Sequence, residues 1–127
     1  MDSGPAENRV VSVSVLFSDI RGFTAFSETM APDSVVEMLS ELHSAMVEVV
    51  FKWGGTLDKF IGDGMMAYFG APLDQPDHAS RAINCALEMQ EALVNLNQKR
   101  IERGDFELEL GVGVNSGPVV AGTIGSM

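Results

Sequence analysis

Apolar residues recur along the chain at spacings that predict four strands and two long helices. Residues 10–20 form an apolar strand that runs out at Asp19-Ile20. Residues 57–61 and 65–69 form two short strands around the turn Gly62-Asp63-Gly64. Strict alternation of apolar and polar or small residues predicts a last, half-buried strand over residues 106–114.

Helical periodicity fills the intervals between these strands. A glycine turn after the first strand leads into a short helical stretch, residues 23–28. The first long helix begins at Pro32, has apolar residues three and four apart from Val35 to Trp53, and ends at Gly54-Gly55. The second long helix ends near Gly104, and its predicted apolar positions are Ala79, Ile83, Ala86, Met89, Leu93 and Leu96.

The order strand, helix, strand, strand, helix, strand predicts an α+β fold with a ferredoxin-like βαββαβ core. This core is an antiparallel sheet with helices on one face. Its first two strands run parallel, with the third strand antiparallel between them. The end of the first strand and the turn between the second and third strands then lie at the same edge of the sheet. Asp19 and Asp63 are therefore expected to meet there.

Two carboxylates at one sheet edge favour metal-dependent phosphate chemistry. Mg²⁺ takes oxygen ligands and keeps open positions for phosphate. Taken singly, Asp19 could cap the following short helix and Asp63 could be an ordinary turn residue. Their predicted proximity favours the metal site. The backbone amides of Gly22, Phe23 and Thr24, which open the short helix, could cradle a triphosphate.

Other polar candidates are less suited to that site. Lys59 precedes Asp63 by four residues on a strand, so their α-carbons stand roughly 13 Å apart and the lysine would not bind the same metal-bound phosphates. A solvated strand lysine is the alternative for Lys59. His43 and His78 lie in or at the start of helices, away from other ligand types, and are not expected to bind metal.

Composition narrows the class of protein. The 127 residues, 46% of them hydrophobic, suit one globular domain, with residues 1–9 expected as a flexible lead and residues 10–127 as the domain. A net charge of −10 with only 8 Lys and Arg argues against a nucleic-acid partner. The single Cys85 favours a reducing, cytoplasmic setting. No stretch approaches the length of a membrane span, so no direct membrane contact is expected, although a longer parent could be anchored through other domains.

Four segments of the chain resemble the catalytic domains of class III nucleotidyl cyclases, in particular those of bacterial adenylate cyclases. The segments are FSDIRGFT (17–24), GGTLDKFIGDG (54–64), FGAP (69–72) and GVGVNSG (111–117). They are spread along almost the whole chain in the order of the family. The resemblance implies a lyase that converts ATP to cyclic AMP and pyrophosphate.

The resemblance also implies roles for individual residues. Asp19 and Asp63, with the Ile20 carbonyl, would hold two Mg²⁺ or Mn²⁺ ions that activate the ribose 3′-hydroxyl and steady the triphosphate. Lys59 matches the purine-reading lysine, which favours ATP; guanylate cyclases usually carry glutamate there. Active sites of the family lie between two domains arranged head to tail, with the aspartates from one and the lysine from the other. A homodimer is therefore implied.

The chain departs from the family pattern in its last part. Pro118 follows the Ser-Gly pair where some relatives carry a phosphate-binding arginine. The sequence stops at Met127, before the stretch that in relatives supplies a second purine contact and the Asn and Arg of the transition state. We therefore expect no transition-state residue in this chain, little activity from it alone, and an apolar segment from Pro118 to Met127 that lacks a strand partner.

Two other functions stay open. A guanylate cyclase would use the same metal chemistry on GTP. A non-catalytic module that binds a nucleotide or a metal and regulates a partner would also keep the two aspartates.

Overall fold

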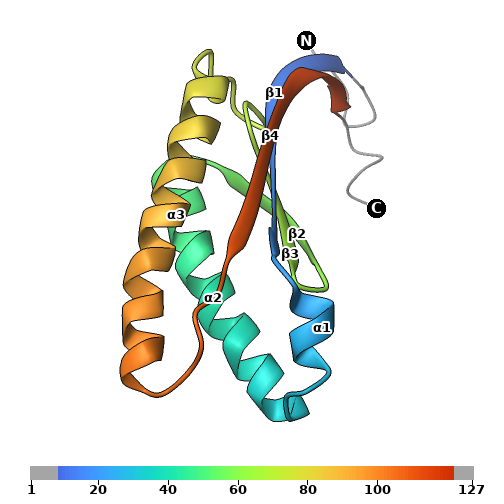
Figure 1. Cartoon of the computed structure of the whole chain (residues 1–127). Helices are drawn as coiled ribbons and strands as arrows, with labels where there is room; N and C mark the ends of the chain where they lie inside the picture. The colour runs from blue at the N-terminus through green and yellow to red at the C-terminus, as the bar shows by residue number, and fades with distance from the viewer. Residues whose placement is uncertain (1–8, 122–127) are drawn as a thin grey trace.

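Four strands form one antiparallel sheet, and two long helices cover one of its faces (Figure 1). The computed structural model describes residues 9–121. The elements in chain order are β1 (Arg9–Ile20), α1 (Phe23–Ser27), α2 (Pro32–Lys52), β2 (Thr56–Ile61), β3 (Gly64–Phe69), α3 (His78–Glu102) and β4 (Leu110–Ala121). The strand order is β2-β3-β1-β4, with β1 and β2 parallel on either side of β3. The predicted ferredoxin-like α+β fold is confirmed.

The core lies between the sheet and the two long helices. The helices contribute Met38, Leu42, Met46, Val49 and Val50 from α2 and Ala82, Cys85, Met89, Leu93 and Leu96 from α3. Ile83, one of the apolar residues that mark this helix in the sequence, is 52% exposed, while its neighbour Ala82 is buried. Apolar residues three and four positions apart can lie on either of two neighbouring faces of a helix. In α3 the face that carries the small residues Ala82 and Cys85 packs against the core.

The β1–β4 pair runs the full length of both strands, from Arg9 opposite Ala121 to Ile20 opposite Leu110. For residues 118–121 this pairing corrects the expectation that the segment from Pro118 to Met127 lacks a strand partner, since Pro118 lies opposite Ser12. Proline fits there because β4 is an edge strand, where a missing N–H removes no ladder bond on the outer side. The expected flexible lead, apart from Arg9, and residues 122–127 lie outside the described residues.

The last strand begins at Leu110, four residues later than the alternating pattern predicts. In the segment just before β4, side chains of α3 make the hydrogen bonds to the backbone that a neighbouring strand would otherwise make. The buried Asn97 donates from Nδ2 to the Leu108 carbonyl (2.9 Å) and accepts from the Leu108 N–H at Oδ1 (2.8 Å). Arg100 donates from Nε to the Phe106 carbonyl (2.9 Å). These bonds satisfy the backbone without a strand partner.

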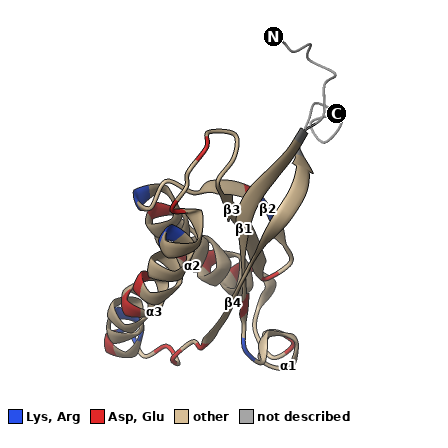
Figure 2. Cartoon of the chain, turned by 90° about the horizontal axis from the view of Figure 1, so that it is seen from above, with Lys and Arg blue, Asp and Glu red and all other residues tan. Residues whose placement is uncertain are grey.

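Charged residues gather on the helices and loops, while the strands carry few (Figure 2). On the helix side, Glu41 accepts from both Arg103 Nη1 (2.7 Å) and Nη2 (2.9 Å), and this hydrogen bonding lowers the pKa of the Glu41 carboxyl. Within residues 9–121, no helix combines the length and the apolar character needed to cross a membrane.

Replacing Asn97 by alanine should lower the free energy of unfolding by about 2 kcal/mol, because it leaves both buried backbone groups of Leu108 without a partner. Asn95→Ala on the exposed side of the same helix is the matched control and should change stability by less than about 0.5 kcal/mol. Urea denaturation of the two variants measures the difference. Equal stabilities would show that Asn97 does not hold the backbone of Leu108.

Candidate functional site

The β1–β3 register brings the β2–β3 turn beside the end of β1. Ser18 pairs with Met65, so β3 begins, at Gly64, next to Asp19. A Cβ at Gly64 would lie 3.1 Å from the Ser18 carbonyl oxygen, closer than ordinary packing, so glycine permits this approach. The turn consists of Gly62 and Asp63, and Gly62 has φ 58°, a conformation that favours glycine.

Asp63 is fixed on this turn by a bond from β1. The Ile20 N–H donates to Asp63 Oδ2 at 2.9 Å. The bond holds one carboxylate oxygen at the end of β1 and leaves the other oxygen of Asp63 available. A carboxylate that accepts a backbone N–H is fixed in direction, which favours a defined ligand geometry.

Asp19 has one oxygen that the surrounding protein does not satisfy. Its Oδ1 is buried, and no hydrogen-bond donor among the described residues reaches it. The nearest positive group is Arg21 Nη1 at 3.7 Å, and the Asp19 side chain as a whole is 44% exposed. A buried carboxylate oxygen without a donor is costly, and a bound cation would remove that cost. The donor set of Asp19 and Asp63 therefore fits a divalent metal.

A pocket of about 430 Å³ opens at these two aspartates. Figure 1 shows α1 and the β2–β3 turn at the same end of the sheet. Six of the seven residues predicted for the site line this pocket. The lining residues are Asp19, Ile20, Arg21, Gly22, Phe23, Thr24, Ala25 and Asp63. The structure therefore brings the predicted metal ligands and the predicted phosphate-binding turn into one cavity.

Lys59, the seventh predicted residue, lies elsewhere on the sheet. It pairs with Met66, whose neighbours Met65 and Ala67 point into the core, so Lys59 lies on the face opposite the helices. A register shift between Leu57 and Lys59 bends this edge strand. The Lys59 ammonium is 3.7 Å from the carboxylate of the adjacent Asp58 and is not among the groups that line the pocket.

Two further residues contact the site and were given no role from the sequence. Arg21 lines the pocket, and its guanidinium occupies the space where a Cβ at Gly111 would collide with it. The sequence could have indicated Arg21 as a site residue, because it follows Asp19 by two residues. His43, on α2, has Nε2 3.2 Å from the Asp63 carbonyl oxygen. Only the folded hairpin reveals this contact, because the two residues lie far apart in the sequence.

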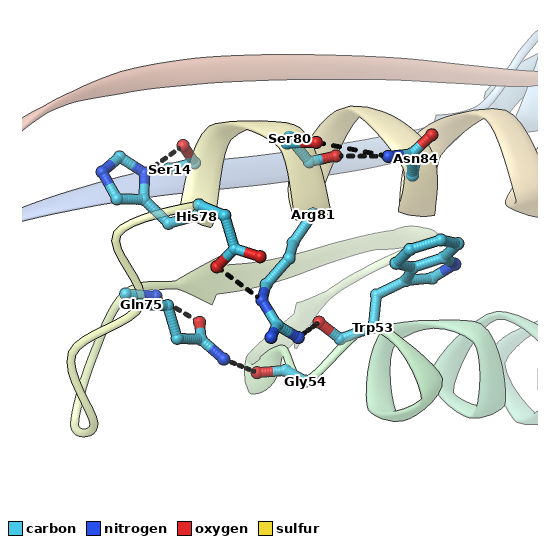
Figure 3. Close-up of polar contacts among 10 residues, drawn as sticks. Ser14, Trp53, Gly54, Gln75, His78, Ser80, Arg81 and Asn84 are labelled. Atoms are coloured by element: carbon cyan, nitrogen blue, oxygen red, sulfur yellow. Dashed lines mark hydrogen bonds and ion pairs between the residues drawn. The ribbon is translucent and has the colours of Figure 1, made fainter.

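His78 lies at the opposite end of β3 from the pocket, beside the hydrogen bonds that join the loop before α3 to the rest of the fold (Figure 3). Its Nδ1 is 2.7 Å from the hydroxyl of the buried Ser14. Gln75 bridges the loop by accepting from the Gly70 N–H (2.7 Å) and donating to the Gly54 carbonyl (3.0 Å). These contacts anchor the loop between β3 and α3, and the role they indicate for His78 is structural.

Elsewhere in the described part of the chain, His, Cys, Asp and Glu side chains do not form an alternative metal centre. Across residues 9–121, no group of three or more His, Cys, Asp and Glu side chains could hold a metal ion. Cys85 is fully buried, and burial raises the pKa of its thiol to about 12, so the thiol stays protonated at neutral pH. Two carboxylates are enough for a Mg²⁺ site that takes its other ligands from water and phosphate.

A family model, described as the adenylate and guanylate cyclase catalytic domain, matches residues 6–127. The chain belongs to this family. Adenylate cyclase 1 of Rhizobium meliloti (strain 1021) is 37% identical over 114 residues, which cover 90% of this chain and 17% of that protein. The cyclase domain described here therefore spans a small part of the curated relatives that it matches.

Solved cyclase structures share the fold. The guanylyl cyclase Cya2 superposes with a TM-score of 0.85 at 43% identity, over 94% of this chain and 59% of that chain. The adenylyl cyclase CyaB from P. aeruginosa gives a TM-score of 0.86 at 34% identity, over 91% of this chain and 61% of that chain. Both nucleotide specificities are thus represented among similar cyclase domains.

Manganese should stabilise the cyclase domain, because a cation bound by Asp19 and Asp63 binds only the folded arrangement. At a Mn²⁺ concentration 100 times its Kd the expected gain is about 2.7 kcal/mol, or a rise in Tm of roughly 10 °C. Thermal melts with and without Mn²⁺ measure this shift.

Asp63→Asn should abolish the shift, while the matched control Asp33→Asn, on the exposed first turn of α2, should keep it. An equal shift in both variants would show that the ion binds elsewhere.

Proposed function

We propose that this cyclase domain is the metal- and triphosphate-binding part of an adenylate cyclase. In the proposed reaction the ribose 3′-oxygen of ATP bonds to the α-phosphorus, the bond to pyrophosphate breaks, and the hydroxyl proton is released. The observation that carries this proposal is the meeting of Asp19 and Asp63 at one pocket, with Asp19 Oδ1 buried and unsatisfied. Similar proteins named adenylate cyclase support it.

The residues of the pocket divide the work of binding. Two Mg²⁺ or Mn²⁺ ions, when bound, would supply the Lewis acid that activates the 3′-hydroxyl and balances charge on the triphosphate. Asp19 and Asp63 would hold them, helped by the Ile20 carbonyl. The backbone amides of Gly22, Phe23 and Thr24 would bind phosphate oxygens where α1 opens.

With a net charge of −10, the chain offers few cationic side chains to bind a triphosphate. Arg21 is the one cationic side chain among the groups that line the pocket. A single exposed guanidinium cannot balance a triphosphate next to two carboxylates. Binding therefore depends on metal ions and on backbone N–H groups, and it should weaken sharply when the metal is removed.

The open face of the sheet supports a head-to-tail homodimer. Asp19 lies on this face, because it alternates with the buried Ser18 and Ile20. Lys59 lies on the same face, two strands away, since β3 separates β2 from β1. A second copy placed over this surface by a two-fold axis could bring Lys59 of the partner subunit to the purine beside Asp19.

Guanylate cyclase is the second candidate, favoured by the 43% identity to the guanylyl cyclase Cya2. Lys59 supports ATP over GTP in our proposal, because an ammonium donates to a ring nitrogen of adenine, whereas a carboxylate would accept from the N–H groups of guanine. The two functions therefore differ in the residue needed at position 59 and share the metal pocket.

Turnover tests the proposal in a longer form of the protein that carries the rest of the catalytic domain, compared with the 127-residue chain. We expect the longer form to make cyclic AMP with Mn²⁺, and the 127-residue chain to be at least about 10²-fold slower, the cost of one lost transition-state donor. Asp19→Ala and Lys59→Glu in the longer form should each abolish cyclic AMP formation, and Lys59→Glu should raise the relative rate with GTP.

Mixing these two inactive variants tests the dimer. Random pairing makes half of the dimers mixed, and each mixed dimer has one intact site, so about a quarter of the wild-type rate should return. No recovery would place Asp19 and Lys59 in one subunit's site. An unchanged purine preference in Lys59→Glu would refute the role of Lys59, and turnover by Asp19→Ala would refute the metal site.

A further inference from the structure

We propose that His43 is a positioning residue that holds the Asp63 turn in the geometry required for metal binding. This inference rests on the proposed function of the pocket. His43 itself does not line the pocket, and its contact is with the backbone carbonyl of Asp63 rather than with the Asp63 carboxylate.

The contact is a hydrogen bond from the helical layer to the turn. His43 Nε2 lies 3.2 Å from the Asp63 carbonyl oxygen. A carbonyl oxygen only accepts, so Nε2 must carry the proton and donate. The bond joins the middle of α2 to the tip of the β2–β3 hairpin. The pairing of β2 with β3 ends at Ile61 and Gly64, so it does not include Asp63.

A second contact fixes the imidazole ring. It stacks on Phe60 of β2 with a centroid separation of 4.5 Å and an interplanar angle of 23°. His43 therefore contacts the strand before the turn as well as the turn itself. Ring stacking orients the Nε2–H toward the carbonyl, which makes the bond directional.

The hairpin tip has little else to hold it. Asp63 is flanked by Gly62 and Gly64, which have no side chains to pack. Phe60 and Ile61, which precede the turn on an edge strand, are 47% and 48% exposed. Burial contributes little here, so specific hydrogen bonds must define the position of the tip.

Asp63 is thus held at two points. Its carbonyl accepts from His43, and its Oδ2 accepts from the Ile20 N–H. Loss of the bond from His43 should let the turn move and weaken the bond from the Ile20 N–H to Asp63 Oδ2. The remaining carboxylate oxygen would then lose its fixed direction, and the affinity for a cation shared with Asp19 should fall.

Two substitutions separate the donor from the ring. His43→Phe keeps an aromatic ring against Phe60 and removes the donor, whereas His43→Gln restores an N–H donor at a similar reach and removes the ring. Mn²⁺ binding is measured by the loss of the free Mn²⁺ signal in electron paramagnetic resonance. Asp63→Asn provides the blank for the site.

We expect His43→Phe to weaken Mn²⁺ binding by about tenfold, the lower end for groups that orient a metal ligand, and His43→Gln to stay within about threefold of wild type. The Tm without metal should be similar in both variants, since His43 acts on one turn. Wild-type affinity in His43→Phe, or an equal loss in His43→Gln, would overturn the proposal.

A second readout needs no metal. The amide of Ile20 donates to Asp63 Oδ2, and this bond should slow its hydrogen exchange. In metal-free His43→Phe its exchange should be about fivefold faster, the effect of one lost hydrogen bond, and His43→Gln should restore the wild-type rate. An unchanged rate in His43→Phe would overturn the proposal.

These measurements also separate this inference from the proposed function. If Asp63→Asn binds Mn²⁺ as wild type does, the metal site fails, while Ile20 exchange still decides the role of His43. His43→Leu is the second variant without a donor. If neither donor-free variant folds, His43 serves global stability, and the positioning role is refuted.

Discussion

The pairing of β1 with β3 is the constraint on which the site depends. The register that places Ser18 opposite Met65 turns Asp19 to the open face and brings the Asp63 turn against Ile20. Side chains alternate along a strand, so a slip of one residue would move Asp19 into the core and its neighbours out of it. The apolar side chains of Leu16 and Ile20 in the core therefore fix the position of a carboxylate on the other face.

This arrangement uses glycine and hydrogen bonds where packing is weak. Gly64 lets the hairpin approach the Ser18 carbonyl, and Gly62 allows the tight turn. The turn then depends on the Ile20 N–H and on His43 for its orientation. A site built in this way can hold a cation between two chain segments without a dedicated cage of side chains, which suits an ion that shares its ligands with phosphate.

Periodicity predicted the fold, and the fold predicted the meeting of Asp19 and Asp63, because strand order and hairpin direction depend on patterns that the sequence carries. It could not predict that Asn97 would replace a strand partner for Leu108, since a side-chain bond to backbone leaves no periodic signal. Nor could it reveal the partner of Pro118 or the contact of His43 with Asp63. Both depend on tertiary pairing between distant segments.

We propose that Asp19 and Asp63 bind the same metal centre. Crystals of the chain soaked with Mn²⁺ and a non-hydrolysable ATP analogue, measured at the manganese absorption edge, test it most directly. We expect anomalous peaks between the two carboxylates, with two ions about 3.5–4 Å apart if both are bound. Manganese held by one aspartate alone, or found only elsewhere on the protein, would contradict it.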